Sequence, residues 1–477
     1  MASKKTLNAK NLEALGARRL AEVLIEVSLG NAAIQRHVRL ELAGAQGPEE
    51  VAKEVRKRLT TLARSRTFVD WQNRKALVGD LEAQRRAINE VARTNCPEAV
   101  ELMWRFMALA NSVCERCDDS SGTVIGIFHG ACQDLGGFAE DAKIAPEIVA
   151  ERVFNALNEN DFGQYDELIS ALSPALGPKG LEQLKERFLE FSKEPLERPK
   201  EKNRRVIGWG TGGPIYADEV ARRRRESTVR LALQEIADIQ GDVDGFIAQH
   251  SEKARTVPRV ATGIARRLLA AGRAEEAWNA INTVDRKGPG WIPFEWEEAR
   301  LDVMEALGQR DEAQAFRLEC FHQTLNRAHL RAYLKRLPEF EDIDAEERAL
   351  SHALRFPKVN QALEFLVSWP ALDKAAMLVI ERASQLDGDR YEILSPAADA
   401  LSAKHPLAAT VLLRAMIDFA LKKGRAKRYQ HAARHLAECE SLASAVGDFG
   451  GFEPHERYHT RLKAEHGRKT GFWTLVY

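Results

Sequence analysis

Four side chains in the first third of the chain have the types and spacing of a structural zinc site. Cys114 and Cys117 form a Cys-x-x-Cys pair, and His129 and Cys132 follow as His-x-x-Cys. Tetrahedral zinc binds such a set of thiolates and imidazole. However, Val113 continues a helical apolar face into Cys114, and residues three apart within a helix need a loop to converge on a metal. We therefore expect buried or surface thiols here, with zinc as the alternative.

A second group of possible metal ligands lies near the C-terminus. His431, His435 and Cys439 are four residues apart, so they share one face of the helix that the sequence predicts there. A metalloprotease helix carries a glutamate after the first histidine, as the general base. Ala432 stands at that position. The pattern therefore excludes peptidase chemistry, and we expect these residues to pack or to line a surface.

A glycine-rich run, GWGTGGP from Gly208 to Pro214, invites comparison with phosphate-binding loops. Such loops present backbone amides at the start of a helix that follows a strand, usually with a lysine. No strand is predicted before this run, no lysine follows it, and Pro214 lacks an amide donor. We interpret the run as part of a linker.

Arginines flank this linker and could bind phosphate groups of a nucleic acid. They are Arg204, Arg205, Arg222, Arg223, Arg224 and Arg225. Binding through such a cluster would weaken steeply as salt rises. Asp218, Glu219 and Glu226 are interleaved with the arginines, so a solvated helix face with internal ion pairs explains them as well. We favour the solvated face and keep nucleic-acid binding as the alternative.

The elements that must position these residues are predicted to be helices almost throughout. Apolar residues recur at intervals of three or four, as they do after Pro48, where Val51, Val55 and Leu59 follow. Proline in the first turn and acids beside it are typical helix starts. Only the range 123–128 looks like a strand, and so short an apolar run is equally compatible with a buried helix.

Composition places the chain among ordinary folded proteins. Of its 477 residues, 44% are hydrophobic and 29% are charged, and the 70 basic and 70 acidic side chains cancel. A balanced charge gives no global reason to bind nucleic acid or an anionic membrane. No segment resembles a membrane span or a signal peptide, and six scattered cysteines are too few for a disulfide scaffold. We expect a cytoplasmic protein without a membrane partner.

The C-terminal half shows a repeat. Gly272 and Gly308 are 36 residues apart, and so are Ala277 and Ala313. This spacing is close to the ~34-residue period of tetratricopeptide repeats. Glycine suits the turn between two helices, and alanine lets them approach closely. We predict an all-α, irregular, tetratricopeptide-like solenoid over 226–477, an N-terminal helical domain over 1–192, and a charged glycine- and proline-containing linker over 193–225.

Three blocks resemble known helical proteins. The block HPLAATVLLRAMIDFALKKGRAKRYQHAARHLAECESLA (405–443) resembles a signature of an uncharacterised bacterial helical family. It is also similar to the helical region that follows the zinc finger of SWIM-type proteins. FVDWQNRKALVGDLEA (68–83) and DDSSG (118–122) resemble the opening of the same region. The zinc finger itself, a CxC pair followed by CxH, is not found in the sequence. The resemblance implies a helical fold and supplies no catalytic residues.

The absence of a recognisable catalytic motif favours a non-enzymatic scaffold or adaptor that binds a protein partner through a groove of the repeats. Arginine and tyrosine contribute strongly at interfaces. The candidate contacts near the resembling block are Arg414, Arg428, Tyr429, His431 and Arg434. The alternatives are a nucleic-acid-associated protein and a metal-dependent enzyme whose site the sequence does not reveal. No cofactor is expected apart from the zinc alternative, and the oligomeric state is left open.

Overall fold

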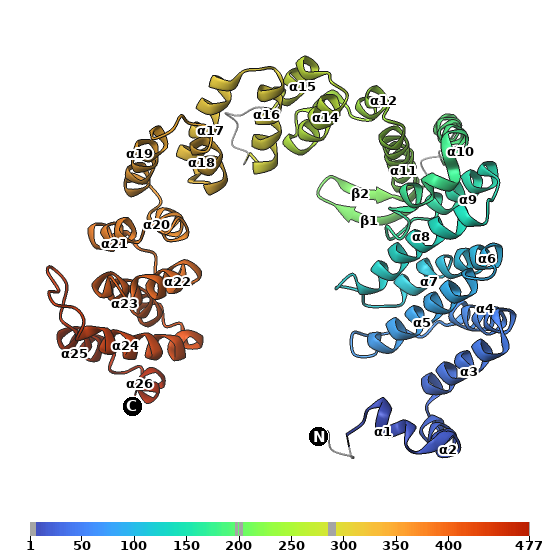
Figure 1. Ribbon diagram of the computed structural model, residues 1–477, viewed down its shortest axis with the longest axis horizontal. Helices are drawn as coiled ribbons and strands as arrows, with labels where there is room; N and C mark the ends of the chain where they lie inside the picture. Colours follow the sequence, from blue (N-terminus) through green and yellow to red (C-terminus); the bar gives the residue numbers. More distant parts are fainter. Residues whose placement is uncertain (1–5, 196–198, 200–203, 285–291, 477) are drawn as a thin grey trace. The chain divides into compact units, whose positions relative to one another are not determined.

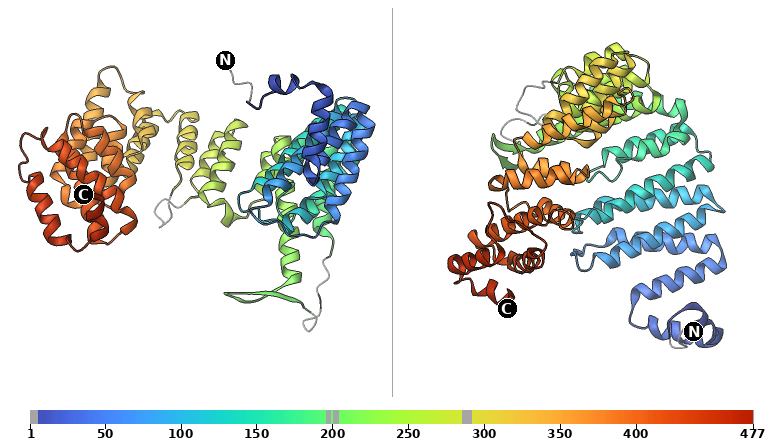
Figure 2. Two further views of the ribbon diagram at one scale, coloured as in Figure 1. Left: turned by 90° about the horizontal axis from the view of Figure 1, so that it is seen from below. Right: turned by 60° about the vertical axis from the view of Figure 1, so that its left-hand side comes forward.

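Helices form nearly all the regular structure of the chain, which confirms the predicted all-α helical-repeat fold (Figure 1). The computed structural model describes residues 6–195, 199, 204–284 and 292–476. Two units are distinguished by their contacts, Met1–Ala254 and Arg255–Tyr477. Within each unit, helices pack mainly against helices one or two places away along the chain. Figure 2 shows this stacking clearly for the helices of the first unit.

The first unit holds the helices up to α12 and the described strands. They are α1 (Ala9–Glu13), α2 (Gly16–Ser28), α3 (Ala32–Gln46), α4 (Pro48–Arg64), α5 (Arg74–Ala92), α6 (Cys96–Met107), α7 (Ala110–Glu115), α8 (Thr123–Asp141), α9 (Pro146–Asn158), α10 (Leu168–Lys193), β1 (Val206–Gly210), β2 (Gly213–Tyr216), α11 (Ala217–Gln240) and α12 (Val243–Ala248). The short α13 (Glu252–Arg255) lies where the two units meet in the sequence.

The second unit is built from helices alone in its described part. They are α14 (Pro258–Ala270), α15 (Ala274–Ile281), α16 (Phe294–Ala306), α17 (Arg310–Thr324), α18 (Arg327–Leu334), α19 (Glu341–Arg355), α20 (Val359–Ser368), α21 (Leu372–Glu381), η2 (Ala383–Gln385), α22 (Tyr391–Leu401), α23 (Pro406–Lys422), η3 (Ala426–Arg428), α24 (Tyr429–Ala443), α25 (His455–His466) and α26 (Thr470–Val476).

Local sequence signals explain where helices begin and which face they bury. Helix α4 begins at Pro48, and its predicted apolar face, including Val51, Val55 and Leu59, is buried. The range 123–128, whose composition also suited a strand, forms the start of α8. Phe128 is buried in that helix, so the apolar run serves the core without a sheet.

The two predicted repeat turns have the same conformation. Gly272 and Gly308 both adopt left-handed backbone angles, with φ of 73° and 74°. This conformation strains residues that carry a Cβ, which explains glycine at both turns. Ala277 and Ala313 lie in the first turn of the helices that follow, and both are fully buried. The repeat therefore reflects two similar helix pairs, α14 with α15 and α16 with α17.

The predicted linker 193–225 contains more structure than expected. Strands β1 and β2 pair antiparallel, with Trp209 opposite Pro214 and Gly210 opposite Gly213. Gly213 has a positive φ of 113° at the turn, a conformation that favours glycine. Residues 196–198 and 200–203 of the linker lie outside the described residues. The glycines that suggested a flexible linker instead belong to a hairpin.

The division between the units also differs from the predicted one, because it falls after Ala254 rather than at 193–225. The reason is the packing of α11. Its apolar residues Val229, Leu233 and Ile236 join the same hydrophobic core as α4 to α10. A separate core in the second unit extends from Phe321 to Trp473. The predicted second domain 226–477 therefore includes helices that belong to the first unit.

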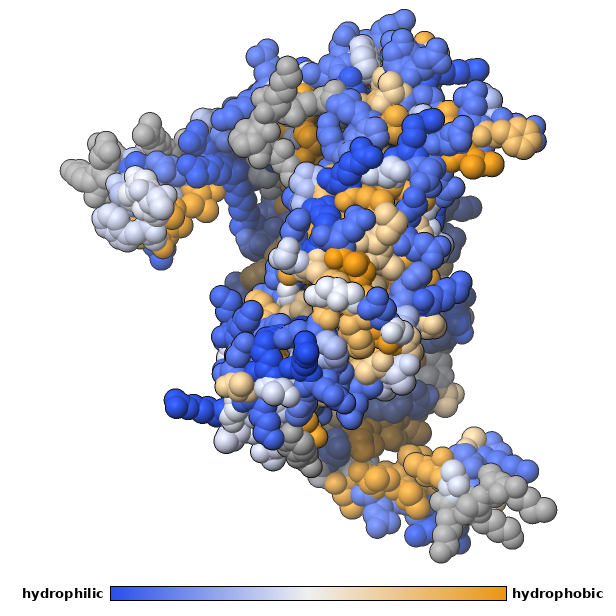
Figure 3. Space-filling model, turned by 90° about the vertical axis from the view of Figure 1, so that its left-hand side faces the viewer, coloured by the Kyte–Doolittle hydropathy of each residue, from blue (hydrophilic) through white to orange (hydrophobic). Residues whose placement is uncertain are grey.

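The face in Figure 3 carries mostly hydrophilic residues, with hydrophobic residues gathered in places among them. No helix among the described residues combines the length and the apolar character needed to cross a bilayer. At the C-terminal end, α26 packs on α24 and buries Phe472 and Trp473. This short helix therefore covers the end of the second unit's core.

Candidate protein-binding pocket

A pocket of about 340 Å³ lies in the second unit and contains several of the predicted partner contacts. Its lining comes from the segment before α22 and from α22, α23, η3 and α24. The lining residues are Gly388, Tyr391, Ser395, Met416, Ala420, Lys427, Arg428, His431, Ala432, Arg434 and His435. Among these described residues, none carries a carboxylate. The pocket therefore presents positive charge together with an apolar floor.

Gly388 allows the wall of this pocket to approach α23. A Cβ at Gly388 would overlap the carbonyl oxygen of Ala415 and lie 2.7 Å from the Cβ of Phe419. Only glycine fits where the backbone comes this close to another helix. The chain then enters α22, whose first residue, Tyr391, exposes 55% of its surface at the pocket. The close approach of the backbones thus places Tyr391 beside the basic residues.

Arg428 is held in place by two neighbours. Its Nη1 lies 2.6 Å from Oδ1 of Asp389, and its guanidinium lies 4.8 Å from the centre of the Tyr391 ring. An arginine stacked on an aromatic ring keeps a defined orientation while its remaining N–H groups can still bind a ligand. Asp389 thus orients the guanidinium toward the pocket region that Tyr391 borders.

Helix α24 supplies the other basic groups of the pocket. Arg434 lies one turn before Glu438, with Nε 3.5 Å from the carboxylate, and Nδ1 of His435 lies 3.1 Å from the same group. Within the described part of the chain, Lys427 and His431 have no carboxylate partner. Positive charge in the pocket is therefore only partly neutralised, and it suits an anionic group of a ligand.

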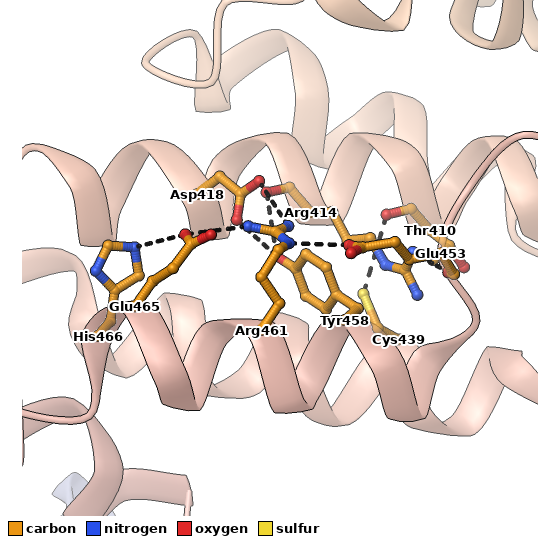
Figure 4. Close-up of polar contacts among 9 residues, drawn as sticks. All are labelled: Thr410, Arg414, Asp418, Cys439, Glu453, Tyr458, Arg461, Glu465 and His466. Atoms are coloured by element: carbon orange, nitrogen blue, oxygen red, sulfur yellow. Dashed lines mark hydrogen bonds and ion pairs between the residues drawn. The ribbon is translucent and has the colours of Figure 1, made fainter.

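Two of the five predicted contacts, Arg414 and Tyr429, lie outside the pocket and pack against other parts of the second unit. Arg414 is 7% exposed, and its Nη1 donates a 2.6 Å hydrogen bond to the carbonyl oxygen of Glu453. Figure 4 shows it beside Tyr458 and Cys439 within a polar network that includes Asp418 and Arg461. Burial lowers the pKa of the Arg414 guanidinium.

Tyr429 is half-buried and meets the ring of Phe472 edge-on, with the ring centres 6.0 Å apart. Neither residue lines the pocket, and partner binding by Arg414 and Tyr429 stays a prediction.

The four residues of the zinc alternative around Cys114 do not form a possible metal-binding group among the described residues. Nε2 of His129 lies 2.8 Å from the carbonyl oxygen of Gly163, and Sγ of Cys132 lies 3.6 Å from that of Gln164. The backbone of Cys117 forms an isolated parallel β-bridge with the backbone of Val69. Burial raises the pKa of Cys114 to about 11 and that of Cys132 to about 12, so both thiols stay protonated.

The His431 face of α24 is likewise divided between surface and core. His431 is exposed at the pocket, whereas Cys439 is fully buried, with Sγ 4.0 Å from the carbonyl oxygen of Thr410. Burial raises the pKa of Cys439 to about 12. The shared helix face therefore does not bring the three side chains to one point, and only the two histidines line the pocket.

Within the described residues, a different group does converge: Glu297, Cys320 and His329. Their possible ligand atoms all lie within 4.8 Å of one another, and all three residues are buried. They come from α16, α17 and α18, so no short sequence motif connects them. Sequence spacing alone could not have identified this group.

The family of the chain is shown by comparison with protein-family models. A model described as a family of unknown function, DUF6880, matches residues 2–475. The chain belongs to this family. No curated protein matches it. A solved structure described as a circular tandem repeat protein with novel repeat topology and enhanced subunit contact surfaces has 16% identity, covering 98% of this chain and 94% of that one, with a TM-score of 0.14.

Membership of the DUF6880 family agrees with the resemblance to an uncharacterised helical family. The further resemblance to SWIM-type proteins and the bacterial origin stay predictions. The family description assigns no role to any residue of the DUF6880 chain, so the arrangement of its own side chains must supply the functional argument.

Most arginines of the predicted nucleic-acid stretch in the DUF6880 chain are engaged with carboxylates. Arg204 contacts Asp218 and Glu219, with Nη2 2.7 Å from the latter. Further ion pairs join Arg222 to Glu226, Arg224 to Asp161 and Arg225 to Glu194. Arg205 and Arg223 are exposed and have no ion pair among the described residues. Of these ion pairs, that of Arg222 with Glu226 lies within α11, whereas Arg224 and Arg225 pair with acids of other segments.

Proposed function

We propose that this DUF6880 chain is a non-enzymatic scaffold whose second unit binds an acidic segment of a protein partner in the pocket between α22 and α24. The observation that carries the proposal is the meeting of Arg428, His431 and Arg434 with Lys427 and Tyr391 around one cavity. Helical-repeat proteins bury each repeat against its neighbours and use the remaining surface for binding. The pocket is such a surface, and its charged lining residues are basic.

The charge and shape of the pocket identify the kind of partner. The cations around the rim attract glutamate and aspartate side chains, and the Tyr391 ring offers the rigid contact area typical of binding hot spots. Met416 and Ala420 provide an apolar floor for a neighbouring hydrophobic side chain of the partner. An acidic peptide segment with one apolar residue satisfies both features.

The test compares capture of partners by matched charge-reversal variants. The full chain, the pocket variant Lys427→Glu/Arg434→Glu and the control variant Lys404→Glu/Arg457→Glu serve as baits in lysate from the native source, with and without nuclease. Lys404 and Arg457 are exposed and lie outside the pocket, so the control changes net charge equally. Mass spectrometry should find a protein captured by the full chain and the control, and reduced at least tenfold with the pocket variant.

Two results would contradict the proposal. Equal capture by the pocket variant would show that these cations do not contact the partner. Loss of every captured protein on nuclease treatment, together with a steep salt dependence, would favour the nucleic-acid alternative through the arginines of α11. The ion pairs of Arg222, Arg224 and Arg225 argue against that outcome, because their carboxylates compete with phosphate.

A further inference from the structure

Three successive helices of the second unit each place one side chain of a metal-ligand type at the same point of the interior. Glu297 on α16 is 8% exposed, and Cys320 on α17 and His329 on α18 are each 2% exposed. Nε2 of His329 lies 2.7 Å from Oε2 of Glu297. All three possible ligand atoms lie within 4.8 Å of one another. A carboxylate, a thiol and an imidazole therefore meet in a buried position.

The chemistry of this donor set favours zinc over other common metal ions. Carboxylate, thiolate and imidazole are all zinc ligands, whereas magnesium and calcium prefer oxygen donors alone. A divalent ion bound by one carboxylate, one thiolate and one neutral imidazole has no net charge. Burial of such a neutral centre avoids the desolvation cost that an unpaired carboxylate would meet. The three residues therefore match zinc in both donor type and charge.

The distances allow an ion to enter with small adjustments. Zinc bonds of roughly 2.0–2.3 Å place tetrahedral ligand atoms about 3.3–3.8 Å from one another. The distance of 2.7 Å between Nε2 of His329 and Oε2 of Glu297 is shorter than this range. The ligand atoms of the three residues lie at most 4.8 Å apart, which is longer than the range. Movements of about 1 Å are within reach of the loosely restrained terminal torsion of a glutamate. The ion would replace the direct hydrogen bond between the two residues.

The surroundings provide a shielded setting for such an ion. The ring of Phe294 meets that of His329 edge-on, with centres 5.0 Å apart. Trp296, next to Glu297 in α16, is 1% exposed, and its Nε1 donates to the carbonyl oxygen of Ile281. Aromatic packing of this kind fixes the orientation of ligands and limits access of bulk water.

We propose that Glu297, Cys320 and His329 bind one zinc ion that joins α16, α17 and α18. The ion would cross-link these helices, and its three ligands are buried and lie apart from the protein-binding pocket. The described residues supply three ligands, and a water molecule would complete the tetrahedron. The site links two helix pairs, α16 with α17 and α17 with α18, that already pack against each other. It is distinct from both zinc sets suggested by the sequence and does not depend on the proposed scaffold function.

Metal analysis of the full chain, purified without a polyhistidine tag, tests the site. Elemental mass spectrometry should find about one zinc per chain, as expected for a single structural site. Cys320→Ser and His329→Gln should reduce this content at least tenfold. Cys132→Ser and Cys439→Ser are matched controls, since both replace a buried cysteine of another suggested set, and they should keep the zinc. Zinc retained by Cys320→Ser, or lost in Cys132→Ser, would overturn the assignment.

A second measurement on the unaltered chain covers the case in which the variants fail to fold. Apo protein, prepared with a chelator, is titrated with cobalt and with zinc. We expect a thiolate-to-cobalt charge-transfer band that saturates at one equivalent, and a rise in the thermal midpoint with zinc, because an ion that binds only the folded state stabilises it. Hydrogen exchange should slow in α16 to α18. Absence of both the band and the thermal shift would refute the site.

Discussion

Replacement of Arg414 separates two contributions to the stability of the second unit, packing and charge. The guanidinium lies 4.3 Å from the centre of the Tyr458 ring, and one nitrogen binds the carbonyl oxygen of Glu453. Its Nε and Nη2 make no hydrogen bond to the described residues. Nearby Cys439 does not neutralise the charge, because burial raises its pKa to about 12 and keeps the thiol protonated. Arg414 is therefore well packed but incompletely hydrogen-bonded.

These contacts give different expectations for two substitutions. Arg414→Ala removes a buried side chain, which costs about 2–4 kcal/mol as other large-to-small changes do. Arg414→Met keeps most of the volume. Both changes leave the Glu453 carbonyl without its donor, which costs about 1 kcal/mol, and both remove the two nitrogens that lack partners, so these contributions are the same for the two variants. The methionine variant should stay within about 1 kcal/mol of the unaltered protein, and the alanine variant should be about 2–4 kcal/mol less stable than the methionine variant.

Urea denaturation followed by circular dichroism measures the free energy of unfolding of both variants. Hydrogen exchange in α23 assigns the transition to the second unit, because a chain with two units need not unfold in one step. Arg457→Ala, at an exposed position, is the control and should change stability by less than about 0.5 kcal/mol. If the methionine variant were as unstable as the alanine variant, the charge would matter more than the packing, and the reasoning would be refuted.

Three further predictions concern backbone conformation and buried thiols. Gly308→Ala should lower the free energy of unfolding by about 1–2 kcal/mol, because φ at Gly308 is 74°. Gly126→Ala within α8 should raise it by about 0.5–1 kcal/mol, because the added methyl group meets no other atom. Thermal unfolding of the two variants distinguishes these effects. Gly136→Ala would push a Cβ into a backbone carbonyl of α10 and should cost more than about 2 kcal/mol, so an unchanged thermal midpoint would contradict that packing. Cys132 and Cys439 should resist iodoacetamide at pH 8 until the protein is denatured, since their raised pKa leaves almost no thiolate; rapid labelling of the native chain, read by mass spectrometry, would disprove this.

The helical architecture could be predicted because its signals are local. A proline start such as Pro48 and the left-handed glycines of the repeat, Gly272 and Gly308, each specify a helix boundary within a few residues. The hairpin at 206–216 was missed because its glycines are equally typical of linkers, and its strands pair only with each other. The unit boundary was missed because an apolar face such as that of α11 looks the same whichever core it joins.

The candidate pocket was only partly predictable for the same reason. Arg428, His431 and Arg434 follow one another within η3 and α24, so local structure brings them together. Arg414 was named as a partner contact because arginine contributes strongly at interfaces, yet it is 7% exposed. The segment that carries Glu453 covers it, and this segment is distant in the sequence. Glu297, Cys320 and His329 likewise come together only because α16, α17 and α18 pack against one another. The periodicity of apolar residues in the sequence does not specify that packing.

Helix α23 connects the stability of the second unit to its proposed binding function. Arg414 and Asp418 lie one turn apart on the face that meets the polar network with Tyr458. Met416 and Ala420 lie on the opposite face and form the floor of the pocket. The network therefore fixes one face of α23, and the opposite face lines the pocket and is available to a ligand. It follows that a substitution at Arg414 should affect partner capture only to the extent that the second unit unfolds, whereas charge reversal at the rim should abolish capture while the fold is kept.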